Sequence, residues 1–234
     1  MFRQIITECL AGVGLPIGED QLDRLEDFCD RLLEKNRVMN LTAVRDKNEA
    51  ARRHMADSLV LLACGGLQGK KILDIGTGTG FPGMPLKLYD PTLDVTMLDS
   101  TAKRIAFIEE AAAALGVSVT TVTGRAEEQA VKMAGRFDIV TSRAVAALDV
   151  LTELSMPFLR VGGFFMPMKS CNDASREEVE KAMHAIEFMG GCLREAYEYE
   201  IEPGVRRQIL RIEKVKPSPK GYPRKYAAIV KKPL

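Results

Sequence analysis

The sequence lacks the features that hold together secreted, metal-bound and membrane-spanning proteins. Its five cysteines show no Cys-x-x-Cys spacing, and its two histidines cannot complete a zinc site with them in any usual register. We therefore expect reduced thiols and no metal. No run of about 18 apolar residues is present, and the N-terminus lacks the charged-then-apolar pattern of a secretory signal. These absences predict a cytoplasmic protein without a membrane span.

Composition indicates a globular protein with an uneven charge distribution. The 234 residues are 46% hydrophobic, enough for one large α/β domain or a domain with a small extension. The net charge is only +1, yet residues 203–234 carry ten Lys or Arg and one acid, which makes this segment +9 and the remainder −8. A basic end of this kind is typical of proteins that bind a polyanion, although a solvated tail would have the same composition.

The most informative segment is an apolar run that ends in an acid and breaks into glycines. Residues 71–83 read Lys-Ile-Leu-Asp-Ile-Gly-Thr-Gly-Thr-Gly-Phe-Pro-Gly. Alternating glycines let a backbone turn tightly and approach a ligand, because no Cβ intervenes and positive φ costs little. Gly76, Gly78 and Gly80 are therefore predicted to bind a cofactor. Asp74 precedes the turn, where its carboxylate can accept hydrogen bonds from loop amides or face a cationic group of the ligand.

A second acid indicates a nucleoside ligand. Asp99 ends the next apolar run and is followed by Ser100, at the place where a carboxylate meets a ribose diol. The glycine spacing also matches the dinucleotide fingerprint, but Pro82 lacks the amide hydrogen that a pyrophosphate needs there. Asp74 would repel a pyrophosphate and suits the ammonium and sulfonium of S-adenosylmethionine. This methyl donor is the expected cofactor, and a dinucleotide is the alternative.

The order of the apolar patterns predicts the fold class, α/β. Residues 1–65 have helical periodicity and are expected to form an N-terminal extension. In residues 66–234, strands alternate with helices, which predicts a doubly wound, mostly parallel sheet with an antiparallel edge. The expected strands are 71–75, 94–98, 117–122, 137–141, 163–168, 193–201 and 205–214, and the expected helices lie near 83–89, 101–115, 147–159 and 173–190.

Ligands of such sheets bind beyond the carboxyl ends of the strands. Two further loops lie there. In the first, residues 124–128, Ala126 and Glu127 are expected to border the adenine of the ligand. In the second, residues 141–144, Arg143 is expected to lie next to the transferred methyl group. A structural ion pair at the strand end is the other interpretation of Arg143.

These motifs resemble those of the RsmG/GidB family, the small-subunit ribosomal RNA guanine-N7 methyltransferases. The resemblance covers residues 25–170 well and the ends loosely. Its most specific parts are Asn-Leu-Thr at 40–42, His-x-x-Asp-Ser at 54–58 and Phe-Pro-Gly at 81–83, since generic methyltransferases lack them. Further matching segments are Leu98–Arg104, Gly124–Glu128, Ser142–Ala144, Gly162–Gly163 before Lys169, and Pro223–Lys225.

The resemblance implies a class I methyltransferase fold with S-adenosylmethionine as cofactor, and a basic C-terminal segment on the methyltransferase domain of residues 66–234. It also implies methylation of N7 of a guanosine in 16S rRNA, in the family within the 530 loop, and both naked rRNA and the assembling small subunit are open as the substrate. We expect a monomer. Donor contacts are implied for Gly76, Phe81, Ala126, Glu127 and Arg143. Positively charged residues at strand ends and in the basic segment are the candidates for RNA contact: Lys169, Arg206, Arg207, Arg224 and Lys225.

The loop after the fourth strand permits this chemistry. It has neither the Asn/Asp-Pro-Pro-aromatic motif of adenine amine methylation nor a cysteine nucleophile for pyrimidine C5. Guanine N7 exposes an in-plane lone pair, so its methylation needs alignment and no general base. Arg143 is expected to act by positioning, and to face solvent so that its loss spares the fold. The alternatives are methylation of another substrate and a non-catalytic RNA-binding protein with a vestigial donor pocket.

Overall fold

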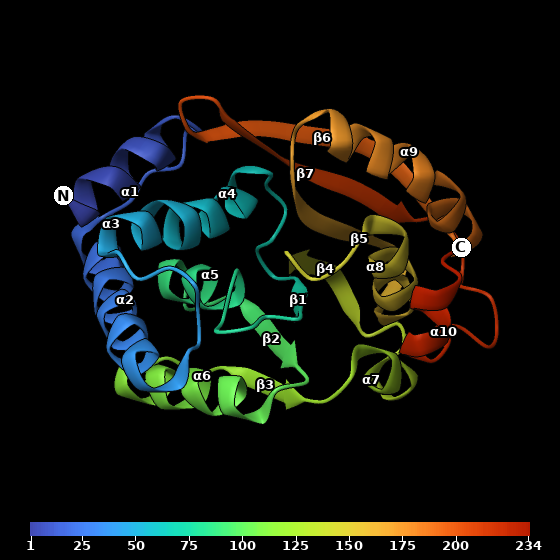
Figure 1. Ribbon diagram of the computed structural model, residues 1–234, viewed down its shortest axis with the longest axis horizontal. Helices are drawn as coiled ribbons and strands as arrows, with labels where there is room; N and C mark the ends of the chain where they lie inside the picture. Colours follow the sequence, from blue (N-terminus) through green and yellow to red (C-terminus); the bar gives the residue numbers. More distant parts are fainter.

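The computed structural model describes residues 1–234 as one seven-stranded sheet covered by helices (Figure 1). The strands are β1 (Lys71–Ile75), β2 (Asp94–Asp99), β3 (Thr120–Thr123), β4 (Phe137–Arg143), β5 (Leu159–Ser170), β6 (Gly191–Glu202) and β7 (Val205–Lys214). Their order is β3-β2-β1-β4-β5-β7-β6; the first five are mutually parallel, and β7 is antiparallel to both β5 and β6. The predicted doubly wound sheet with an antiparallel edge is confirmed.

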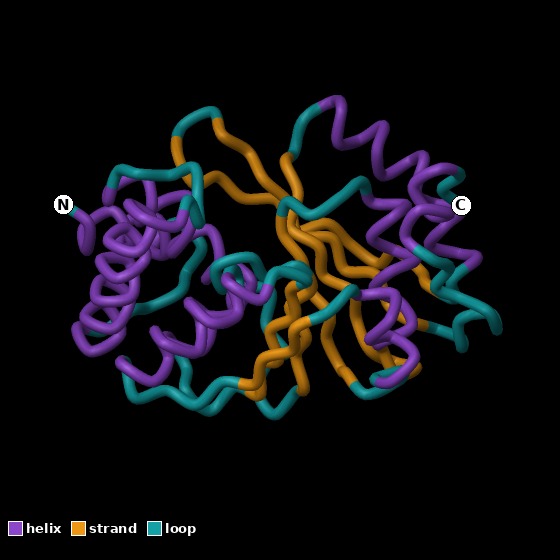
Figure 2. Tube along the Cα trace, turned by 60° about the horizontal axis from the view of Figure 1, so that its bottom comes forward, coloured by secondary structure: helices purple, strands orange, loops and turns teal.

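The helices lie on both faces of this sheet (Figure 2). They are α1 (Phe2–Ala11), α2 (Glu19–Met39), α3 (Lys47–Ala50), a π-helical segment (Ala51–Ala56), α4 (Asp57–Ala63), α5 (Gly83–Tyr89), α6 (Ala102–Ala114), α7 (Ala126–Lys132), α8 (Leu148–Ser155), a 3₁₀ turn (Met156–Phe158), α9 (Asp173–Phe188) and α10 (Tyr226–Lys231). No helix is both long enough and apolar enough to cross a membrane.

Several details differ from the sequence prediction. Strand β5 begins at Leu159 instead of 163, because the helix expected over 147–159 ends at Ser155 and the 3₁₀ turn after it ends at Phe158. Strand β3 begins at Thr120 instead of 117, because its pairing with β2 starts there, with Thr120 opposite Thr96. Helix α7 was not predicted; it buries only Ala130 and so has no apolar stripe. Helix α10 was also not predicted, since the prolines before it favoured loop.

The two faces of the sheet carry separate cores, as the alternation of side chains along a strand requires. In β1, Ile72 belongs to the cluster formed with α1, α2, α5 and α6, whereas Leu73 belongs to the cluster formed with α7, α8 and α9. The N-terminal helices thus share a core with the sheet through residues such as Phe28 and Phe81, whose ring centroids are 5.7 Å apart. The division at residue 65 falls in the loop between α4 and β1 and stays a proposal.

The basic C-terminal segment is largely ordered structure. Residues 205–214 are strand β7, which lies inside the sheet between β5 and β6; the irregular parts are residues 203–204, 215–225 and 232–234. Helix α10 then packs on α8, where Ile229 is fully buried. The interpretation of the whole segment as a solvated tail is therefore excluded.

Candidate functional site

The glycine loop follows β1 and is tied to the end of β2. The amides of Gly76 and Thr77 donate to the carbonyl oxygen of Leu98 at 2.8 and 3.0 Å. Gly76, Gly78 and Gly80 have φ of 67°, 59° and 99°, a region that side chains disfavour and glycine adopts readily. The loop is thus a tight turn at the carboxyl edge of the sheet, as its sequence predicts.

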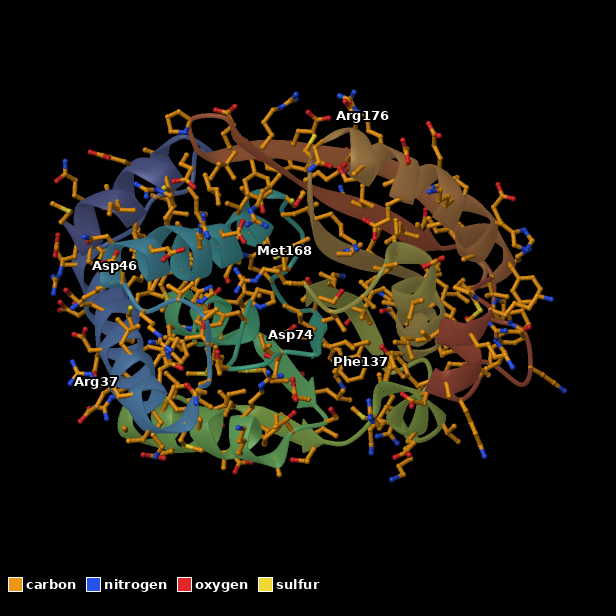
Figure 3. All side chains as sticks on the ribbon, in the orientation of Figure 1. Arg37, Asp46, Asp74, Phe137, Met168 and Arg176 are labelled. Atoms are coloured by element: carbon orange, nitrogen blue, oxygen red, sulfur yellow. The ribbon has the colours of Figure 1, made fainter.

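Asp74 lies beneath this loop near the centre of the molecule (Figure 3). It is fully buried, and its Oδ2 accepts hydrogen bonds from Thr77 Oγ1 at 2.6 Å and from the Gly83 amide at 2.9 Å. Its Oδ1 has no partner. Burial raises the pKa of this carboxyl to about 6, partly offset by the two hydrogen bonds. A buried carboxylate with a free oxygen is suited to receive a cationic group.

Asp99 connects three backbone segments at the end of β2. Its Oδ2 accepts the Gly78 amide at 2.9 Å and lies 3.6 Å from a guanidinium nitrogen of Arg104, and its Oδ1 accepts the Thr101 amide at 2.8 Å. Each carboxylate oxygen has two acceptor directions, so capacity for a hydroxyl remains. The carboxylate is almost fully buried but borders a cavity.

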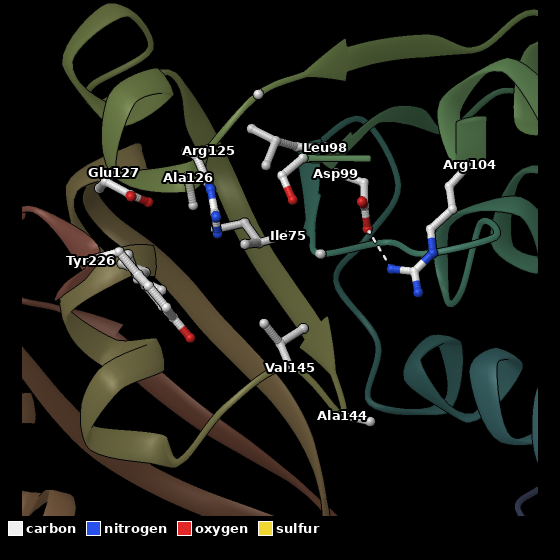
Figure 4. A pocket seen from close by; sticks show the side chains of 14 residues that line it. Ile75, Leu98, Asp99, Arg104, Arg125, Ala126, Glu127, Ala144, Val145 and Tyr226 are labelled. Atoms are coloured by element: carbon white, nitrogen blue, oxygen red, sulfur yellow. Dashed lines mark ion pairs between the residues drawn. The ribbon is translucent and has the colours of Figure 1, made fainter. Parts of the chain in front are cut away.

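That cavity, of about 250 Å³, opens beyond the carboxyl ends of β1, β2 and β3 (Figure 4). It brings together five residues that the sequence predicted for the donor site: Gly76, Asp99, Ser100, Ala126 and Glu127. Other residues in its lining were not predicted: Arg104, Arg125, Val145, Leu154 and Tyr226. Tyr226 comes from α10 at the far end of the chain, so only tertiary packing could place it there.

Four predicted donor residues do not line this cavity: Gly78, Gly80, Phe81 and Arg143. A Cβ built on Gly80 would lie 2.6 Å from Met84 Cγ, so Gly80 permits packing of the loop on α5. Around Gly78 the corresponding space is open. Phe81 is buried between Phe28 and the His54 ring, whose centroid is 4.6 Å away. Donor contact by all four residues stays a prediction.

Arg143 lies at the end of β4 with only 10% of its side chain exposed. Its Nη1 donates to Asp57 Oδ2 at 3.0 Å and to the Arg53 carbonyl at 2.7 Å, and its guanidinium lies 5.2 Å from the centre of the Phe81 ring. The expectation of a solvent-facing side chain is therefore wrong. It failed because α4, distant in sequence, supplies a buried acid directly beside the strand end.

Asp57 joins four elements around this arginine. It is fully buried, and its Oδ1 accepts the Tyr199 hydroxyl of β6 at 2.8 Å and lies 3.4 Å from Nε of Arg207 in β7. The nearby His54 ring has Nε2 3.0 Å from Thr42 Oγ1. Burial and the charge of Arg143 lower the His54 pKa to about 4, so the imidazole is neutral at physiological pH.

Most of the predicted RNA contacts have partners inside the chain. Lys169 donates to Glu178 and to the Ala146 carbonyl, which ties down the loop after β4. Arg143, Lys169 and Arg207 also line a second cavity of about 420 Å³, and Ala144 lines both this cavity and the first one. The ion pairs of the other predicted arginines are Arg206 with Glu198, Arg207 with Asp57, and Arg224 with Glu153. Lys225 is exposed and has no acidic partner.

The sequence matches a known protein family over most of its length. The family model described as GidB, rRNA small subunit methyltransferase G, matches residues 21–200. The chain is 41% identical over 230 residues to ribosomal RNA small subunit methyltransferase G of Lachnoclostridium phytofermentans, covering 96% of this chain and 94% of the relative. It is 39% identical to the protein of the same name from Streptococcus sanguinis, covering 100% of both.

Solved structures resemble the fold at low sequence identity. Cofactor-bound Rv0187 from MTB matches with a TM-score of 0.59 at 16% identity, covering 89% of this chain and 96% of that one. TYW2 of M. jannaschii in complex with AdoMet matches with a TM-score of 0.55 at 15% identity, covering 68% and 76%. At these identities the likeness shows the fold alone, which is that of class I methyltransferases.

Proposed function

The chain belongs to the GidB family, the rRNA small subunit methyltransferases G, and from this premise we propose that its acceptor is N7 of a guanosine in 16S rRNA. Family membership makes the protein an rRNA methyltransferase that uses S-adenosylmethionine. The proposal adds the acceptor atom and the 16S molecule, with the 530 loop of the small subunit as its location. It further implies a protein that acts as a monomer in the cytoplasm.

The observation that carries the acceptor atom is the absence of a free base at the end of β4. Asp57 is occupied by two arginines and Tyr199, and neutral His54 lies against Thr42 with its other ring nitrogen 3.4 Å from Arg143. An exocyclic amine must lose a proton to become methylated, whereas N7 of guanine attacks through a lone pair that it already has. A site that aligns its substrates without accepting a proton therefore fits N7.

The polar and acidic residues around the donor cavity support S-adenosylmethionine as its ligand. Of the lining residues, we assign Gly76 to close approach of the donor to the backbone, and Asp99 with Ser100 to the ribose. Asp74 is fully buried and does not line the cavity; we assign its partnerless Oδ1, beneath the glycine loop, to the donor ammonium. Ala126 and Glu127 border the adenine. The bound donor supplies the methyl group on a sulfonium. Arg143, in the adjoining cavity, is assigned to position the donor carboxylate or the guanine O6.

Product mapping tests the acceptor. The purified protein is incubated with labelled donor and either 16S rRNA or small subunits from cells that lack the protein, and the RNA is treated with borohydride and aniline. Because this treatment cleaves the strand at N7-methylguanosine, we expect enzyme-dependent cleavage at one guanosine. Label incorporated without cleavage would mean that another atom accepts the methyl group and would overturn the proposal.

Asp74→Asn should stabilise the donor-free protein and abolish donor binding. In the folded chain the pKa of Asp74 is raised from 3.8 to about 6, so ionisation of this group opposes folding as the pH rises through that range. We expect the variant to be more stable by roughly 1–3 kcal/mol at pH 8, with the difference fading as the pH falls from 6 to 4. The amide keeps the bonds to Thr77 and Gly83 but cannot neutralise an ammonium.

Thermal unfolding across pH and calorimetry with S-adenosylmethionine measure both effects. The control is Asp94→Asn, at an exposed acid at the start of β2, which should change neither. Retention of wild-type donor affinity by Asp74→Asn would contradict the assignment of the ammonium.

Lysines without an acidic partner should contribute more to the salt dependence of RNA binding than arginines that already form ion pairs. Lys225, Lys231 and Lys232 are exposed on or beside α10 and form no ion pair, whereas Arg206 and Arg211 already face Glu198 and Glu195. Replacing the three lysines with Ser should reduce the slope of log K against log salt by up to about 0.7–0.9 for each phosphate that the variant no longer neutralises.

Arg206→Gln/Arg211→Gln is the matched comparison, and its slope should change less. Filter binding to 16S rRNA at several salt concentrations provides the measurement. An unchanged slope in the triple lysine variant would mean that α10 does not touch the RNA.

A further inference from the structure

The end of the chain is anchored to α8 by a buried ion pair. Glu153 is fully buried, and its carboxylate accepts the Arg224 amide at 2.8 Å and Nε at 2.9 Å, while the terminal guanidinium nitrogen pairs with its other oxygen. Leaving a buried carboxylate without such partners is strongly unfavourable, so this ion pair fixes the position of the chain just before α10.

Apolar packing fixes the helix itself. Ile229 is fully buried in a small cluster with Val150 and Leu154 of α8. Leu154 is also part of the lining of the donor cavity. The two anchors, Arg224 on one side and Ile229 on the other, therefore hold the intervening residues of the chain against the cavity.

Tyr226 is the residue held there. Its side chain lines the cavity together with Ala126 and Glu127, on the side away from Asp99 (Figure 4). The guanidinium of Arg125 lies 5.7 Å from the centre of its ring, and 37% of the residue remains exposed. The ring is fixed in position and borders a cavity assigned to a nucleoside, so it is available for stacking on a base.

We propose that the ring of Tyr226 is the wall against which the adenine of S-adenosylmethionine packs, so that α10 completes the donor site. Asp99 takes the ribose at one end of the cavity, and the base attached to that ribose reaches toward α7 and α10 at the other. Tyr226 and Arg125 then enclose the adenine from the side that the sheet leaves open. This inference rests on the donor and the assigned ribose site, and is independent of the acceptor proposed above.

Calorimetry with S-adenosylmethionine and with 5′-methylthioadenosine tests the contact. Tyr226→Ala should weaken both ligands by about tenfold or more, because both contain adenine and base–aromatic stacking has this size. Tyr226→Phe keeps the ring and should bind within about twofold of wild type, as should Val230→Ala at an exposed position of the same helix. Equal affinity of Tyr226→Ala and wild type would overturn the proposal.

A spectroscopic readout does not depend on the alanine variant keeping α10 in place. The chain has no tryptophan, so Tyr226→Trp introduces a single indole. Its emission should change on titration with S-adenosylmethionine and saturate at the calorimetric affinity, whereas Val230→Trp should not respond. An indole at position 226 that is insensitive to the bound donor would refute the contact.

The outcomes separate this inference from the acceptor assignment. If the wild type binds the donor through Tyr226 but methylates an atom other than guanine N7, the proposed acceptor is wrong and the contact between Tyr226 and the adenine is confirmed. If product mapping gives N7-methylguanosine and Tyr226→Ala binds normally, the reverse holds.

Discussion

Arg143→Ala should reduce methyl transfer at least tenfold and lower the free energy of unfolding by about 2–4 kcal/mol. The first effect follows from the place of Arg143 in the lining of the second cavity, beside Ala144, which lines both cavities. The second follows from Asp57, which is fully buried and would be deprived of its nearest cation, at 3.0 Å. Arg207 remains 3.4 Å from the same carboxylate, so the loss of stability should be partial. Steady-state kinetics and denaturant unfolding measure the two effects.

A double variant separates the two roles of this arginine. Arg143→Ala/Asp57→Asn removes the unpaired charge, so it should recover part of the lost stability while methyl transfer stays low. The pH profile of the residual reaction should stay flat around neutrality, because no proton is removed and the pKa of His54, at about 4, is far below that range. Normal turnover of Arg143→Ala would show that the residue is structural only. A wild-type rate that collapses on protonation near neutral pH would argue against N7.

Gly78→Asp should weaken binding of S-adenosylmethionine by at least about 100-fold without unfolding the protein. A Cβ at this position meets no atom within 4 Å, and Asp tolerates the φ of 59° better than most residues do. The new carboxylate would lie beside Asp99, which accepts the Gly78 amide at 2.9 Å. It would add a second negative charge where the ribose hydroxyls need acceptors and where the loop must stay open.

Gly78→Asn is the matched control, because it has nearly the same shape and backbone tolerance without the charge. Calorimetry should show a smaller loss, of about tenfold, for Asn than for Asp. Equal losses of affinity in Gly78→Asp and Gly78→Asn would mean that the shape of the side chain, and not its charge, causes the effect. Unchanged affinity in Gly78→Asp would mean that this glycine does not border the donor, in keeping with its absence from the cavity lining.

Sequence reasoning succeeded where neighbouring residues determine the structure. The glycine loop at residues 76–80 requires positive φ. Asp99 is the last residue of an apolar strand and Asp74 the last but one, so their place at the sheet edge follows from local pattern. The ion-pair partners of the basic residues could not be predicted in this way. Arg206 and Arg207 of β7 were predicted to contact RNA, and the structure shows that Arg206 pairs with Glu198 of β6 and Arg207 with Asp57 of α4.

The sequence by itself determined the alternation of strands and helices, the glycine turn, the donor and the family, because strand periodicity, backbone freedom and motif spacing are local properties. Only the tertiary structure decided which side chains meet at the site. Asp57 of α4 pairs with Arg143 of β4, and Tyr226 of α10 reaches the cavity beside Ala126. Such contacts depend on how helices far apart in the chain pack on the sheet. Burial then converts a surface charge into a paired one, and no spacing in the sequence encodes that step.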